Sequence, residues 1–206
     1  MRPGSGKIKV LLSGLCLFCL MFDAGSVTGV RAEEITVTTA EKMKEACKSK
    51  GPFVVVNALA EGDGRKWKEL LAKVASGDAS WDNDWIGASA CLSIGVAYNG
   101  FVSFQSLDIA WAKALPKNPV GVLGTLRELN ISIAGACSMP FIYPHPSDGK
   151  GPGPEFIEAY MKNTLGALET ITDDLMKPVA EDCERYLKRS YEGYKNRKEQ
   201  FPEIGN

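Results

Sequence analysis

This sequence has few of the residues from which catalytic and metal sites are usually built. Its single histidine, His145, means that a zinc site would have to be completed by carboxylates or cysteines. It has no glycine-rich phosphate loop and no HExxH motif. These absences argue against a phosphate-loop nucleotide binder and against a zinc protease of the HExxH type. We expect neither a cofactor nor a metal.

The chain also lacks an excess of basic residues. The whole sequence has 24 Lys and Arg against 25 Asp and Glu, and removal of residues 1–32 leaves 20 against 24, a net charge near −4. A protein that binds nucleic acid or anionic lipid normally carries a strongly basic patch. The charge balance therefore excludes nucleic acid and anionic membrane surfaces as expected partners.

Residues 1–32 have the pattern of a cleaved secretory signal peptide. Basic residues precede an apolar run, Ile8–Phe22, and small residues stand at Val30 and Ala32, just before the predicted cleavage site. Neither Cys16 nor Cys19 has a small residue directly before it, which argues against a lipoprotein. We expect a bacterial protein that is released, soluble, into the periplasm or outside the cell.

Four cysteines remain after residue 32: Cys47, Cys91, Cys137 and Cys183. They are 44, 46 and 46 residues apart and form no C-x-x-C pair, which excludes the usual redox and zinc spacings. In an oxidising compartment, an even number predicts two disulfides, with three possible pairings. Pairing in sequence order is favoured because consecutive helices tend to be neighbours in space.

One stretch, Trp81–Leu115, dominates the chain. It has no charged side chain from Trp85 to Leu107, and Asp82, Asn83 and Asp84 precede it as candidate N-cap acceptors. Small residues recur every four positions along it, so another helix could approach closely. Its length would suit a membrane span, but serines, glycines and amides interrupt it, and no basic cluster flanks it. It predicts a buried central helix, and we expect no stable membrane insertion.

The remaining segments predict an all-α, single-domain helical bundle of about six to eight helices over residues 33–206. A helix from Thr38 to about Ser49 is favoured by the capping-box spacing of Thr38 and Glu41. Residues 53–60 fit either a helix or a strand, with helix slightly favoured. Further helices are expected from Trp67 and Pro119, and from Pro154 to Leu175, with a restart at Pro178. Residues 143–154, rich in Pro and Gly, predict a flexible loop.

The second half of the chain resembles a family of uncharacterised small exported bacterial proteins. The matching motifs are Ala114–Pro119, then Val122 and Leu123, then Cys137–Ile142, and finally Cys183. The resemblance covers roughly residues 85–190. It implies an all-α exported domain in which Cys137 and Cys183 pair, and it implies no activity.

Two groups of residues are candidate interaction sites. The loop carries His145 with Asp148 nearby, but so short and flexible a segment cannot hold a catalytic triad in position. On the last predicted helix, Tyr and Arg side chains, which are enriched at binding hot spots, could form a patch. The patch residues are Tyr186, Arg189, Tyr191 and Tyr194. The alternative is a partly buried helix end with solvated charges.

Two further patterns have simpler explanations than a site. Asp82, Asn83 and Asp84 fail the calcium-loop motif because Ile86 and Ser93 stand where acidic or amide ligands are required. The four tryptophans could line a ligand pocket, but tryptophans at amphipathic spacing usually belong to a core.

These observations predict an exported, non-catalytic protein-binding module. Such a module could act as an inhibitor or immunity-type protein directed at an envelope enzyme or toxin. Its partner would be a protein in the periplasm or outside the cell. The alternatives are an envelope hydrolase or small-ligand carrier that uses the 143–154 loop, and a structural envelope component.

Overall fold

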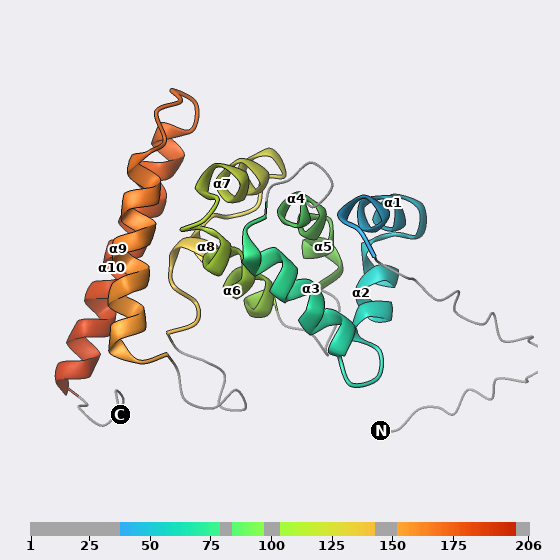
Figure 1. The fold of residues 1–206 in the computed structure, drawn as a ribbon, viewed down its shortest axis with the longest axis horizontal. Coiled ribbons are helices and arrows are strands. Elements are labelled where there is room, and N and C mark those ends of the chain that lie inside the picture. Colours follow the sequence, from blue (N-terminus) through green and yellow to red (C-terminus); the bar gives the residue numbers. More distant parts are fainter. Residues whose placement is uncertain (1–37, 79–83, 97–103, 143–151, 201–206) are drawn as a thin grey trace, which may run out of the picture. The chain divides into compact units, whose positions relative to one another are not determined.

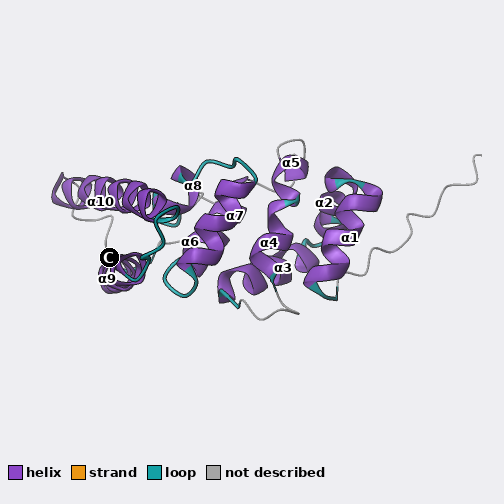
Figure 2. Ribbon diagram, turned by 90° about the horizontal axis from the view of Figure 1, so that it is seen from above, coloured by secondary structure: helices purple, strands orange, loops and turns teal. Residues whose placement is uncertain are grey.

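The computed structural model describes residues 38–78, 84–96, 104–142 and 152–200 (Figure 1). Within these ranges every regular element is an α-helix (Figure 2). The helices are α1 (Ala40–Lys50), α2 (Pro52–Ala60), α3 (Arg65–Ser76), α4 (Trp85–Ala90), α5 (Leu92–Val96), α6 (Phe104–Ala114), α7 (Pro119–Glu128), α8 (Ala134–Cys137), α9 (Pro154–Glu169) and α10 (Lys177–Gln200). Apart from the short α4, α5 and α8, each has nine residues or more. The predicted all-α fold is confirmed.

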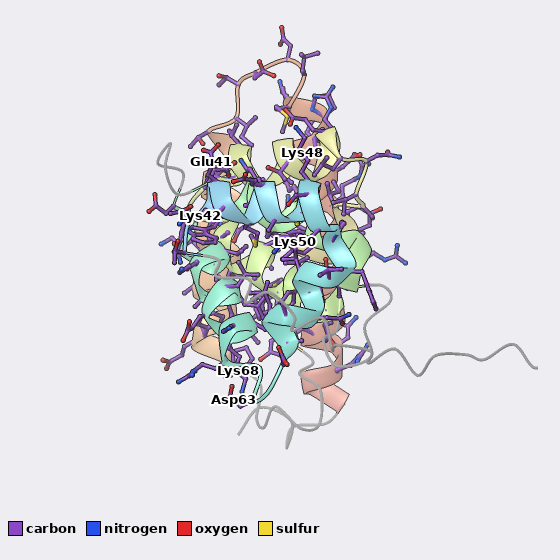
Figure 3. All side chains as sticks on the ribbon, turned by 90° about the vertical axis from the view of Figure 1, so that its right-hand side faces the viewer. Glu41, Lys42, Lys48, Lys50, Asp63 and Lys68 are labelled. Carbon is purple, nitrogen blue, oxygen red and sulfur yellow. A yellow bond between two sulfur atoms is a disulfide. The ribbon has the colours of Figure 1, made fainter. Side chains whose placement is uncertain are left out.

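The first helix begins one residue later than the capping-box spacing predicts. Thr39, not Thr38, is the N-cap, and its hydroxyl accepts a hydrogen bond from the Lys42 N–H at 3.2 Å. Ala40, Met43 and Cys47 lie on one buried face of this helix. The charged residues of α1 lie on the exposed side, as the labelled Glu41, Lys42, Lys48 and Lys50 show (Figure 3).

Residues 53–60 are helical, as favoured by the sequence. Gly51, with a positive φ of 88°, ends α1 and precedes Pro52, the first residue of α2. Val55, Val56 and Leu59 are buried, and α2 packs against α1, α3 and α5, whereas the neighbouring Phe53 and Val54 are about half exposed. The β-branched run is therefore divided between two faces of a helix, and tertiary packing overrides its strand propensity.

The predicted single central helix is wrong for the part that the structure describes. A turn at Cys91 separates α4 from α5, and residues 97–103, between α5 and α6, lie outside the described ranges. Ser89 and Ser93 each donate a hydrogen bond from their hydroxyl to the backbone carbonyl three residues earlier, at 2.7 and 2.8 Å. Such back-bonding competes with the helical ladder and bends helices, which explains the interruption.

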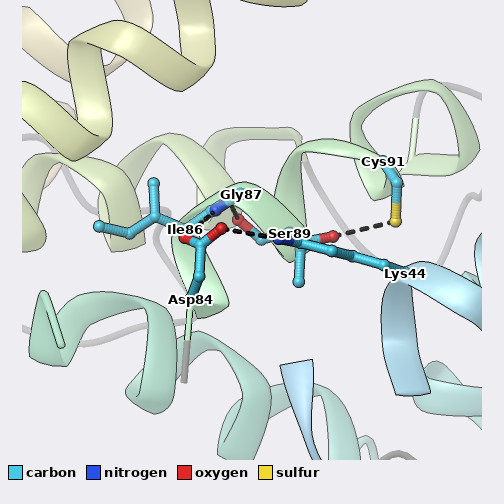
Figure 4. A network of polar contacts seen from close by, with 7 residues as sticks. Lys44, Asp84, Ile86, Gly87, Ser89 and Cys91 are labelled. Atoms are coloured by element: carbon cyan, nitrogen blue, oxygen red, sulfur yellow. Dashed lines mark hydrogen bonds and ion pairs between the residues drawn. The ribbon is translucent and has the colours of Figure 1, made fainter. Parts of the chain in front are cut away.

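One of the small residues in this stretch, Gly95, does permit close approach of another helix, as predicted. A Cβ on Gly95 would lie 2.6 Å from the carbonyl oxygen of Pro52 at the start of α2, so only glycine fits there. At the start of α4, Asp84 is the N-cap and accepts the Gly87 N–H at 2.9 Å (Figure 4). Lys44 of α1 donates to the other oxygen of Asp84 at 2.7 Å. Capping is thus the role of Asp84, whereas Asp82 and Asn83 lie outside the described residues.

That network also determines the ionisation of Asp84. Partial burial by itself raises the pKa of this carboxyl, but the hydrogen bonds from Lys44 and from the Gly87 N–H outweigh burial. The pKa is consequently lowered from its usual value. Asp84 is therefore a charged cap at neutral pH, where it complements the positive end of the helix.

The described tryptophans belong to the main core. Trp67, Trp85 and Trp111 are at most 5% exposed, and they pack with apolar residues of α1 to α8. The buried indole N–H of Trp111 donates to the Ser89 hydroxyl at 2.9 Å, so its polar atom is satisfied. These three side chains are core residues, as the simpler explanation predicted.

The two disulfides have the favoured pairing. Cys47 of α1 bonds to Cys91 beside α4, and Cys137 of α8 bonds to Cys183 of α10. Such bonds persist in oxidising compartments outside the cytoplasm, which agrees with the predicted export. In the described residues, no helix is both long and apolar enough to cross a membrane.

The last two helices pack against each other (Figure 1). Pro154 opens α9 as predicted, but α9 ends at Glu169 rather than continuing to Leu175, which is exposed. A turn then precedes α10, whose second residue is Pro178, where the restart was expected. Phe141 and residues of α9 form a second core cluster against the Leu187 side of α10.

Candidate functional site

A hollow lies between α8 and α10 and is the best candidate for a binding site in the described residues. Its volume is about 530 Å³. We call it the α8–α10 hollow, and its lining residues are Ala134, Gly135, Ser138, Tyr186, Arg189, Ser190, Gly193 and Arg197.

The chain builds the two walls in different ways. The α8 wall comes from a four-residue helix and the Ser138 that follows it, whose hydroxyl donates to the Gly135 carbonyl at 3.3 Å. The α10 wall comes from Tyr186 and from the lining residues three, four, seven and eleven positions after it. This spacing places them on one helical face.

A disulfide fixes the two walls to each other. Cys137, the last residue of α8, and Cys183, one turn before Tyr186, are fully buried, with their Cα atoms 5.2 Å apart. The neighbouring face of α10, which includes Leu187, packs against the second core cluster. The hollow is consequently pre-formed, and a ligand would not have to bring its walls together.

The side chains around the hollow differ sharply in size. Glycine, alanine and serine provide most of the lining, whereas Tyr186, which is 42% exposed, and the exposed Arg189 are large. Arg189 makes no hydrogen bond or ion pair with any described residue, whereas Arg197 does have an interaction partner. Arg189 is thus available to bind a group from another molecule.

A buried carboxyl lies directly behind the α8 wall. A Cβ built on Gly135 would come within 2.3 Å of Oδ1 of Asp108 from α6, so the backbone of α8 rests on this carboxyl. Oδ1 is buried and accepts no hydrogen bond from the described residues. Burial raises the pKa of Asp108 from 3.8 to about 6. Asp108 does not line the hollow, and its proximity to Gly135 fixes how closely α6 and α8 approach.

The structure divides the residues predicted for a site. Tyr186 and Arg189 line the hollow, whereas Tyr191 and Tyr194 are partly buried against the second core cluster. The rings of these last two tyrosines stack, with centroids 6.4 Å apart. His145 and Asp148 lie outside the described residues, with most of the predicted 143–154 loop.

The sequence-based prediction missed the other lining residues. Ser190, Gly193 and Arg197 share a helical face with Tyr186, so the spacing could have identified them. The lining residues of α8 have no comparable spacing pattern in the sequence, because they are held next to α10 by the disulfide. No group of three or more His, Cys, Asp or Glu in the described ranges could hold a metal ion.

Comparison of the chain with protein-family models, with curated proteins and with solved structures gives no match.

Proposed function

We propose that this chain is an exported, non-catalytic binding module and that the α8–α10 hollow receives part of a partner protein. The observation that carries the proposal is a pre-formed hollow with two exposed anchor residues, Tyr186 and Arg189. Tyrosine and arginine dominate the energetics of many protein interfaces. The predicted signal peptide and the two disulfides support an extracytoplasmic location.

The form of the hollow favours a protein over a small molecule as the partner. Its lining comes from only two segments, residues 134–138 and 186–197. Small-ligand pockets normally bury most of the ligand among apolar and aromatic side chains. This lining has one aromatic ring, and its walls are mostly small, which suits a protruding segment of a larger partner. Inhibition of an envelope enzyme or toxin is the activity that we propose for such binding.

Site-specific photo-crosslinking in the native cell envelope tests this proposal. A photoreactive amino acid placed at Ser190, inside the hollow, is compared with the same amino acid at Glu192, which is exposed on α10 outside the lining. We expect one dominant protein adduct from position 190 and a much weaker one from position 192. Equal adduct patterns at the two positions would contradict a role for the hollow.

A second variant separates binding from catalysis. His145→Ala should change the affinity for the crosslinked partner by no more than about threefold, which is less than 1 kcal/mol. If a hydrolytic activity accompanied the protein and was lost in this variant, the non-catalytic proposal would be wrong.

A further inference from the structure

We infer that the α8–α10 hollow recognises carboxylate groups, and that its occupant is an acidic segment of the partner protein anchored by Arg189. This inference rests on the proposed function and assigns the chemical class of the bound segment. The argument follows from the charges on α10, the composition of the lining and the net charge of the chain.

The charge pairs along α10 leave Arg189 available. Three other cations of this helix are paired with acidic residues of the same helix: Arg185 with Asp182, Lys188 with Glu184, and Lys195 with Glu192. Arg189 has no such partner in the described part of the chain, although it stands among them. Its guanidinium can therefore form a bidentate pair with an incoming carboxylate without first breaking an internal ion pair.

The lining supports the same assignment. It contains two arginines and no acidic residue, so an anion in the hollow meets no like charge from the lining. Gly193, where nothing lies within 4 Å of an added Cβ, leaves the α10 wall without a bulky side chain, which lets the backbone of a bound peptide approach closely. Ser190 adds a hydroxyl that can donate to a carboxylate or accept a backbone N–H. Tyr186, half exposed beside Arg189, supplies apolar contact area.

The charge of the whole chain favours a short acidic peptide segment over a long polyanion. The formal net charge is −1 at pH 7 for the whole sequence and near −4 without residues 1–32, so no wide positive field surrounds the hollow. A nucleic acid strand gains its affinity from many cations spread along its path. A protein segment with a few Asp or Glu residues needs only the local site that Arg189 provides.

Nuclear magnetic resonance titration of the isotope-labelled, disulfide-intact protein tests the inference. The probes are two blocked decapeptides, one alternating Glu and Ala and the other alternating Gln and Ala. We expect the Glu peptide to shift the backbone amide signals of Gly135 and Gly193 saturably, with an affinity at least about tenfold higher than that of the Gln peptide. Equal shifts from both peptides would overturn the assignment of a carboxylate ligand.

Matched variants locate the binding. Arg189→Gln should weaken binding of the Glu peptide about tenfold, because it removes a charge-assisted bidentate contact. Arg185→Gln removes the same charge one turn away, outside the lining, and should change the affinity by less than about twofold. An equal loss in the two variants would show a diffuse charge effect and refute the inference. Inorganic phosphate and acetate are then compared as competitors of the Glu peptide. Displacement by phosphate at a lower concentration than by acetate would also refute the preference for carboxylate.

The two proposals can fail separately. A position-190 crosslink to a protein whose binding is unaffected by Arg189→Gln would leave the proposed function standing and overturn the inference. Selective Glu-peptide binding without any position-190 crosslink would retain the anion site and overturn the proposed docking of a protein.

Discussion

Replacing Asp108 with asparagine should stabilise the protein at neutral pH. The Asp108 carboxyl lies against Gly135 with Oδ1 buried and without a hydrogen bond from the described residues. Burial disfavours the charged form, which raises the pKa of Asp108 to about 6. Asparagine has nearly the same shape but no charge, so it should remove the cost of burying a carboxylate.

The structure gives both the sign and the size of the effect. Because the pKa of Asp108 is raised on folding, its protonation favours the native state. The resulting stability is fully present below the unfolded-state pKa of about 4 and is lost as the pH rises through about 6. A shift from 3.8 to about 6 corresponds to at most about 3 kcal/mol. Since the carboxyl is partly exposed, solvent screening reduces this to about 1 kcal/mol.

Thermal unfolding of Asp108→Asn and of the unaltered protein at two pH values is the assay. At about pH 7.5 the variant should melt about 2–4 °C higher, the shift that 1 kcal/mol gives in a domain of this size. The difference should shrink at about pH 4.5, where native Asp108 is mostly protonated. The control variant Asp174→Asn removes an exposed carboxylate, and its melting temperature should differ little from that of the unaltered protein at either pH. An Asp108→Asn melting difference that is unchanged between the two pH values would refute the reasoning.

Four other variants test the fold. Gly135→Ala should destabilise the protein by about 1–3 kcal/mol in denaturant unfolding, because its Cβ would lie 2.3 Å from a carboxylate oxygen. Gly166→Ala, in a helix interior with nothing within 4 Å of the new Cβ, should stabilise it by about 0.5–1 kcal/mol. Replacing Cys137 and Cys183 with alanine should cost up to about 4 kcal/mol, the loop-closure term for a separation of 46 residues, and a loss below about 1 kcal/mol would contradict that estimate. Asp84→Ala should cost about 1 kcal/mol through loss of a helix cap, and an unchanged unfolding midpoint would show that the cap contributes nothing.

Local signals in the sequence were sufficient to predict much of the fold. Asn118 caps α7 through the Gly121 N–H at 2.9 Å, with Pro119 at the first helical position, as its spacing predicts. Both disulfides pair in sequence order. These features depend on short-range chemistry or on the adjacency of consecutive elements, which a single sequence records.

Other features depend on contacts that the sequence does not record. The break at Cys91 arises from hydroxyl back-bonding by Ser89 and Ser93, which the apolar pattern conceals. The α8–α10 hollow brings small residues near Gly135 to a helix face that begins about 50 residues later. Only the α10 wall of the hollow could be predicted in part from the sequence, through Tyr186 and Arg189.

The most direct test of the central claim is to fill the hollow and measure the affinity for the crosslinked partner. Ser190→Trp places a large side chain within the lining, whereas Glu192→Trp places the same side chain on the exposed surface of α10 outside it. If the hollow receives the partner, Ser190→Trp should raise the Kd at least about tenfold and Glu192→Trp should leave it nearly unchanged. Equal affinities of the two variants, with both folded and both disulfides intact, would contradict the account.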